Sequence, residues 1–99
     1  MTSIHGAKQP KRADVVVIGG GIAGVMTALT LAERGVSVVL CEKGAIGGEQ
    51  SGRNWGWCRV MGRDPREIPL MMEAKRQWQG MNARIGGETG YRQAGIFYL

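Results

Sequence analysis

The chain has 99 residues, of which 43% are hydrophobic and 21% charged, a balance that is typical of one small globular domain and argues against disorder over most of the length. The net charge is +5, but the basic residues form no stripe with interleaved aromatics, so no nucleic-acid partner is predicted. Two cysteines without metal-ligand spacing predict neither a disulfide framework nor a metal site. Without a secretory signal or a long apolar run, we expect a cytoplasmic protein whose only membrane association would be peripheral.

The first half of the chain predicts a βαβ unit. Residues 1–12 are polar and aperiodic, and we expect a flexible leader there. Residues 14–18 form a β-branched run typical of a buried parallel strand, and residues 37–42 form a second one. Between them, residues 22–34 predict an apolar helix that ends at Gly35. The fold class is therefore α/β, with a Rossmann-like unit at the start.

The second half is less regular. Residues 43–63 are too rich in glycine for a regular element and predict a long functional loop. Residues 64–67 (DPRE) have the form of a capping box, and a helix with one apolar face is expected over about residues 70–85. Pro69 is expected to delay or kink its first turn. Residues 91–99 have the composition of a strand.

The segment 19–24 (GGGIAG) matches the pattern G-x-G-x-x-G between a predicted strand and a predicted helix. Gly19 permits the tight turn, Gly21 lets the backbone approach a pyrophosphate, and Gly24 allows close helix–strand packing. The phosphates would lie at the helix N-terminus, beside Ile22 and Ala23, where N–H groups and the helix dipole favour negative charge. The pattern predicts a dinucleotide site, the alternative being a glycine turn that binds nothing.

An acidic residue follows the second predicted strand. Glu42 lies eighteen residues beyond Gly24, where a carboxylate accepts hydrogen bonds from a ribose hydroxyl. The same negative charge repels a 2′-phosphate, so NADP is disfavoured.

These residues resemble a known family. The FAD-type fingerprint of the glutathione-reductase superfamily is matched by Gly19, Gly21, Gly24, Ala28, Leu31, Gly35, Val38, Glu42 and Lys43. Residues 49–56 (EQSGRNWG) resemble the E-x-S-x-x-N-x-G stretch of the DAO-type FAD-dependent oxidoreductases, which include D-amino-acid dehydrogenase and glycine and sarcosine oxidases. Residues 90–98 resemble the strand pair that begins that family's substrate domain. The resemblance implies that residues 13–99 are the N-terminal part of an FAD-binding domain, with the substrate domain beginning at about residues 88–99.

The resemblance also implies a reaction. A hydride passes from the carbon that bears an amine to flavin N5, and the resulting imine is hydrolysed, so the substrate is a small amine or amino acid. The glycine turn, Glu42 and Lys43 would hold the ADP moiety. The pyrophosphate and the inner face of the isoalloxazine would be approached by Ser51, Arg53, Asn54 and Gly56. No catalytic residue is identified, and the residues that clamp a substrate carboxylate in the family are expected outside this chain.

Two alternatives stay open. A βαβ unit with one further helix leaves strand edges uncovered, so we expect a fragment, inactive alone, that a C-terminal domain or a partner subunit completes. The second hypothesis is accordingly a dinucleotide-binding fragment or subunit without catalysis of its own, completed in trans. A third is an NAD-dependent dehydrogenase or a flavin hydroxylase with the same fingerprint, although residues 51–56 favour the first interpretation.

Overall fold

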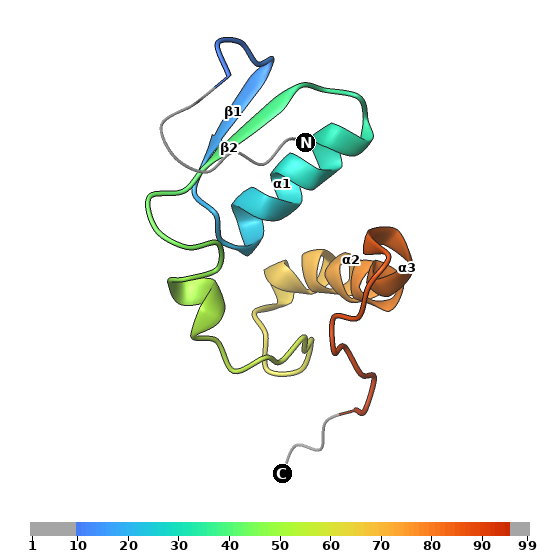
Figure 1. Ribbon diagram of the computed structural model, residues 1–99. Helices are drawn as coiled ribbons and strands as arrows, with labels where there is room; N and C mark the ends of the chain where they lie inside the picture. Colours follow the sequence, from blue (N-terminus) through green and yellow to red (C-terminus); the bar gives the residue numbers. More distant parts are fainter. Residues whose placement is uncertain (1–9, 96–99) are drawn as a thin grey trace. The chain divides into compact units, whose positions relative to one another are not determined.

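The computed structural model describes residues 10–95, which divide into one compact unit that ends at Trp55 and another that begins at Gly56. In chain order the elements are β1 (Val15–Ile18), α1 (Ile22–Glu33), β2 (Val38–Cys41), the 3₁₀ helices η1 (Gln50–Gly52) and η2 (Pro65–Glu67), α2 (Ile68–Gln79) and α3 (Met81–Ile85) (Figure 1). The α/β class and the βαβ unit are as predicted. Within the described range, no helix is long and apolar enough to cross a membrane.

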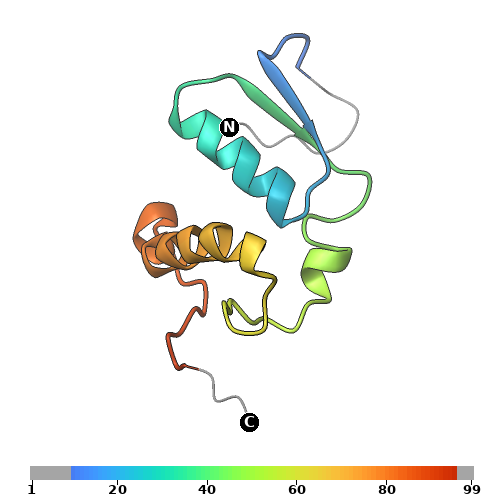
Figure 2. The ribbon, with the colours of Figure 1, turned by 180° about the vertical axis from the view of Figure 1, so that it is seen from behind.

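In the first unit, β1 and β2 pair in parallel, with Val15 opposite Val38 and Ile18 opposite Cys41. Helix α1 packs along one face of this strand pair, as both views show (Figures 1 and 2). Ala28 of α1 is completely buried and Val38 is 7% exposed, so the core of the unit lies between helix and strands.

The prediction that both strands are buried is correct for one face only. Val16 and Ile18 of β1 are 58% and 87% exposed. Successive side chains of a strand point to opposite faces of the sheet, and within the described residues α1 covers one of those faces. Both strands are apolar at nearly every position, as in a sheet that is covered on both sides. Their sequence therefore does not show which face packs against α1.

The glycine turn sets how closely α1 approaches β1. The Gly19 N–H donates to the Cys41 carbonyl at 2.8 Å and so extends the ladder past the last residue of β1. Its φ of +113° is in the region that favours glycine. A Cβ atom on Gly24 would lie 1.8 Å from the Gly19 carbonyl oxygen. Only glycine at position 24 permits this approach.

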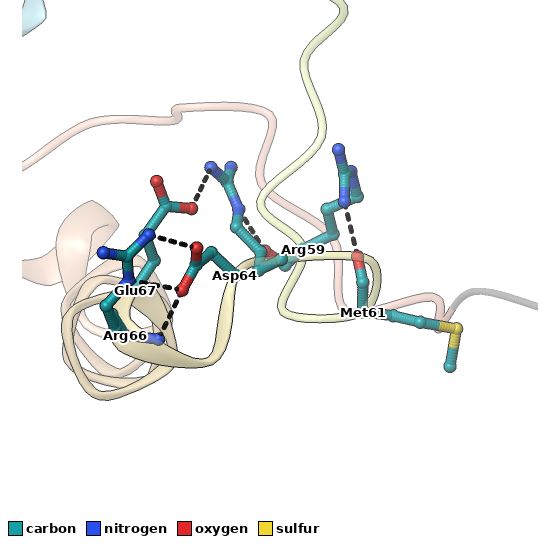
Figure 3. A network of polar contacts seen from close by, with 6 residues as sticks. Arg59, Met61, Asp64, Arg66 and Glu67 are labelled. Carbon is teal, nitrogen blue, oxygen red and sulfur yellow. Dashed lines mark hydrogen bonds and ion pairs between the residues drawn. The ribbon is translucent and has the colours of Figure 1, made fainter.

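Of the capping box predicted at the start of the helical part of the second unit, the structure confirms the Asp64 cap, whereas the Glu67 carboxylate pairs with Arg63 at 3.6 Å. Asp64 accepts a hydrogen bond from the Arg66 N–H at 2.9 Å (Figure 3), and Pro65 occupies the first helical position. These residues form η2, after which α2 starts at Ile68, earlier than expected. Pro69 lies in the first turn of α2, where no intrahelical donor is required, so the proline neither delays nor breaks the helix.

Two predictions for the second unit are wrong in the described residues. The single helix expected to residue 85 is divided at Gly80 into α2 and α3, with Met81 buried at the start of α3. Residues 91–95 belong to no strand, although Tyr91 stacks on Trp78 with ring centroids 5.9 Å apart. A strand needs a neighbour to accept its backbone hydrogen bonds, which composition alone cannot supply. Residues 96–99 and the leader before residue 10 lie outside the described residues.

We predict that Gly24→Ala lowers the free energy of unfolding by about 3 kcal/mol, because the new methyl group must displace backbone rather than a flexible side chain. Denaturant unfolding followed by circular dichroism measures the change. Gly80→Ala is the matched control, since its methyl group meets no atom within 4 Å. Equal stability of the two variants would contradict the role assigned to Gly24.

Candidate functional site

The carboxylate of Glu42, directly after β2, is held against the glycine turn by both of its oxygens. Oε1 accepts a hydrogen bond from the Gly20 N–H at 3.0 Å, and Oε2 accepts one from the Gly44 N–H at 2.6 Å. The Gly44 bond and then the Gly20 bond lower the pKa of Glu42 from its ordinary value of 4.5. The group is therefore ionised at neutral pH, and each oxygen keeps a lone pair for a further donor.

Ser51, in η1, contacts the first residue of α1. Its Oγ accepts a hydrogen bond from the Ile22 N–H at 2.8 Å, across 29 positions of sequence. The first N–H groups of a helix have no acceptor within the helix, so this contact satisfies one of them. A Cβ atom on Gly21 would lie 3.0 Å from the same Oγ, and the Asn54 amide donates to the Ser51 carbonyl. The folded loop thus lies directly against the helix N-terminus.

The contacts around the middle glycine were not predicted from the sequence. The Gly47 N–H donates to the Gly20 carbonyl at 2.8 Å. A Cβ atom on Gly20 would lie 2.7 Å from Cδ1 of Ile46 and 2.9 Å from Cγ of Glu42. The sequence offered one signal for these contacts: Gly20 is a glycine at a position where the pattern G-x-G-x-x-G accepts any residue. Gly20 therefore shapes the turn as much as the two motif glycines that flank it.

A family model described as FAD dependent oxidoreductase (DAO) matches residues 14–99. The chain belongs to this family of FAD-dependent oxidoreductases. The match confirms the resemblance in residues 19–56 and the FAD assignment, and it favours the first hypothesis over an NAD-dependent dehydrogenase.

The proteins to which this chain is similar are much longer, and the alignments cover only a small part of their length. L-amino acid deaminase from Proteus myxofaciens, solved in complex with anthranilate, is 49% identical with a TM-score of 0.84, and the alignment covers 93% of this chain and 20% of that one. Gamma-glutamylputrescine oxidoreductase of Escherichia coli is 54% identical over 43 residues, which are 43% of this chain and 10% of the relative. Glycine oxidase of Pseudomonas putida is 47% identical over 38 residues, 38% of this chain and 10% of the relative. The chain thus spans about a fifth of the solved structure and a tenth of these curated relatives.

Three other residues predicted for the flavin site, Lys43, Arg53 and Gly56, are exposed. Lys43 is exposed, and its charge makes only a minor contribution to the lowered pKa of Glu42. Arg53 is exposed and forms an ion pair with Glu49 at 3.2 Å. Gly56, with a φ of +72°, is the first residue of the second unit. The structure therefore brings together the glycine turn, Glu42, Ser51 and Asn54, whereas the Lys43 and Arg53 side chains are exposed and Gly56 belongs to the second unit.

The two tryptophans of the loop are not core residues among the described residues. Trp55 is 86% exposed and Trp57 is 62% exposed, whereas Cys58 is half-buried. Most of the surface of both indole rings is therefore exposed within the described residues.

We predict that the melting-temperature difference between the protein and Glu42→Gln is constant near neutral pH and narrows as the pH falls below 4.5. The pKa of Glu42 is lowered in the folded state, so its stabilisation is present above the ordinary pKa and is lost as the pH falls through the lowered value. Thermal unfolding across a pH series provides the measurement. Glu49→Gln, which removes an exposed carboxylate in the same unit, is the control and changes the melting temperature little. A difference that persists undiminished in acid would count against the carboxylate assignment.

Proposed function

We propose that this chain supplies the ADP- and pyrophosphate-binding part of the flavin site in an enzyme that oxidises the C–N bond of an amino acid or amine. The observation that carries the proposal is the Glu42 carboxylate, ionised and held at a glycine turn from which α1 begins. The family's dependence on FAD supports the identity of the cofactor.

The residues at the turn fit such a group. Gly21 carries no side chain and directly precedes α1. At this helix end a phosphate gains most from backbone N–H donors and the helix dipole. In this proposal Gly19, Gly21, Ile22, Ala23 and Gly24 approach the pyrophosphate, Glu42 and Lys43 face the adenosine ribose, and Ser51, Arg53, Asn54 and Gly56 continue toward the isoalloxazine. The Ser51 hydroxyl accepts from Ile22 and retains its proton to donate to a phosphate oxygen.

The substrate class follows from the relatives. Two of them are named for amino-acid substrates and one for an amine, which supports an amino acid or amine as substrate. Bound FAD would supply the two-electron acceptor for hydride removal from the amine-bearing carbon, and water would then hydrolyse the imine. The role of this chain is to bind and orient the cofactor, while residues from about 88 onward begin the substrate domain. Completion in trans by a partner subunit remains the second candidate.

We expect the full-length protein to show the visible absorption bands of oxidised flavin and to lose them when an amino acid or amine is added without oxygen. Spectrophotometry with a panel of amino acids of both hands and simple amines provides the measurement. A colourless protein that takes up NAD but not FAD would refute the proposal. Flavin bands that no member of the panel bleaches would instead favour the non-catalytic candidate.

Ser51→Ala is predicted to raise the dissociation constant for FAD about tenfold, because it leaves the Ile22 N–H without its acceptor and removes a donor to phosphate. Fluorescence titration of the full-length apoprotein with FAD measures the change. Ser37→Ala is the matched control, since Ser37 contacts Asp14 through its backbone. Equal FAD affinities for the two variants would remove Ser51 from the proposed site.

A further inference from the structure

The segment that follows α3 is held by one side chain of that helix, Asn82. Its Nδ2 donates a hydrogen bond to Oε1 of Glu88 at 3.2 Å. Its Oδ1 accepts two hydrogen bonds from Thr89, one from the backbone N–H at 2.9 Å and one from the hydroxyl at 2.7 Å. The Asn82 carbonyl also accepts a hydrogen bond from the Gly87 N–H at 3.1 Å. Because a carboxamide is both donor and acceptor, this one side chain joins two consecutive residues of the segment to α3.

The hydrogen bonds continue along the segment. Oε1 of Glu88 accepts a second bond, from the Gly90 N–H at 2.8 Å, and Oγ1 of Thr89 accepts one from the Tyr91 N–H at 3.2 Å. Side-chain oxygens are therefore the acceptors for the N–H groups of residues 89–91. No strand of the described residues pairs with these three residues, so side chains supply the acceptors that a sheet would otherwise supply.

The far end of the segment packs on α2. The ring of Tyr91 stacks on that of Trp78, with the centroids 5.9 Å apart and an angle of 20° between the planes. A hydrogen bond of 3.4 Å between the exposed side chains of Gln79 and Gln93 adds a weaker contact. The segment is thus fixed at two points, at Asn82 on α3 and at Trp78 on α2.

The bonds of Asn82 are better shielded from water than the bond of Gln79. Asn82 and Thr89 are both half-buried, whereas Gln79 is exposed. Without the Asn82 acceptor, the N–H and the hydroxyl of Thr89 would be partly desolvated and unpaired. Such unpaired groups cost more than the loss of an exposed hydrogen bond, because water does not replace the missing partner fully.

We propose that Asn82 is a positioning residue for substrate binding: through Thr89 and Tyr91 it fixes the place from which the substrate domain starts. The inference rests on the proposed function, in which that domain begins at about residues 88–99. A displacement of about 1 Å far from a binding group is enough to weaken what that group does, so release of the segment from α3 lowers substrate affinity. Most of the residues proposed for FAD belong to the other compact unit, and the cofactor is expected to stay bound.

The test uses the full-length protein with FAD bound. Anthranilate is titrated while the flavin spectrum is followed; its amine-bearing carbon carries no hydrogen, so it reports binding without turnover. Hydrogen exchange over residues 86–95 is measured by mass spectrometry on the same preparation. We expect Asn82→Ala to raise the dissociation constant for anthranilate about tenfold, to speed exchange over this segment about tenfold and to retain FAD. Gln79→Ala is the matched control and should change none of these, because it removes only the exposed contact with Gln93.

A compensating pair of substitutions separates the hydrogen bonds of Asn82 from a general loss of stability. Asn82→Asp keeps the acceptors for Thr89 but removes the donor to Glu88 and places two carboxylates side by side, so we expect weaker anthranilate binding. Addition of Glu88→Gln to this variant supplies a donor again and should restore the affinity. Glu88→Gln alone keeps an oxygen for the Asn82 and Gly90 donors and should bind anthranilate like the unsubstituted protein.

An Asn82→Ala variant that keeps its flavin and binds anthranilate as tightly as before would overturn the inference, and so would unchanged exchange over residues 86–95. Loss of FAD from the folded variant would contradict it too, because the role would then concern the whole protein. If Asn82→Ala does not fold, the pair decides: a double variant that binds no better than Asn82→Asp counts against the inference. Absence of flavin bands from the unsubstituted protein refutes the proposed function itself, whereas failure of the inference alone leaves those bands in place.

Discussion

The contact between the backbone of Gly24 and the carbonyl of Gly19 determines how the first unit is built. A Cβ atom at position 24 would lie 1.8 Å from that oxygen, so the absence of one lets α1 begin after only three intervening residues and still pack on β1. This proximity places the start of the helix beside the end of β2, where Glu42 follows. A helix displaced outward by a side chain at position 24 would separate the carboxylate from the turn that it binds.

The features of the fold that could be predicted from the sequence are those set by residues close together along the chain. Gly19 and Gly24 could be assigned from spacing, and Asp64 from its place before Pro65. The break at Gly80 had only a weak signal, since an isolated glycine inside a helix costs about 1 kcal/mol and is often tolerated. The contact of Ser51 with Ile22 joins residues 29 positions apart, and resemblance to a family indicated the segment but not the contact.

Under the proposed function, a hydroxyl at position 51 has an electrostatic advantage over a carboxylate. An aspartate there would also accept the Ile22 N–H, but its negative charge would repel a phosphate at the same helix end. A serine is neutral, accepts from the backbone and donates outward. The negative charge lies instead on Glu42, which accepts hydrogen bonds from the Gly20 and Gly44 N–H groups and keeps lone pairs for further donors.

Glu42 and Arg59 share a feature that separates them from the surface ion pairs of the chain. Backbone groups orient both side chains: N–H donors orient the Glu42 carboxylate, and the Met61 carbonyl orients the Arg59 guanidinium. Because these backbone groups carry no formal charge, they do not neutralise the charge of either side chain. The exposed pairs, such as Arg66 with Asp64, cancel each other and contribute little to stability. A sequence reveals how many charges are in excess but not which of them the backbone holds, because only the folded loop decides which arginine reaches a carboxylate. For that reason Arg59 was indistinguishable from Arg63 and Arg66 until the turn at residues 60–63 was seen.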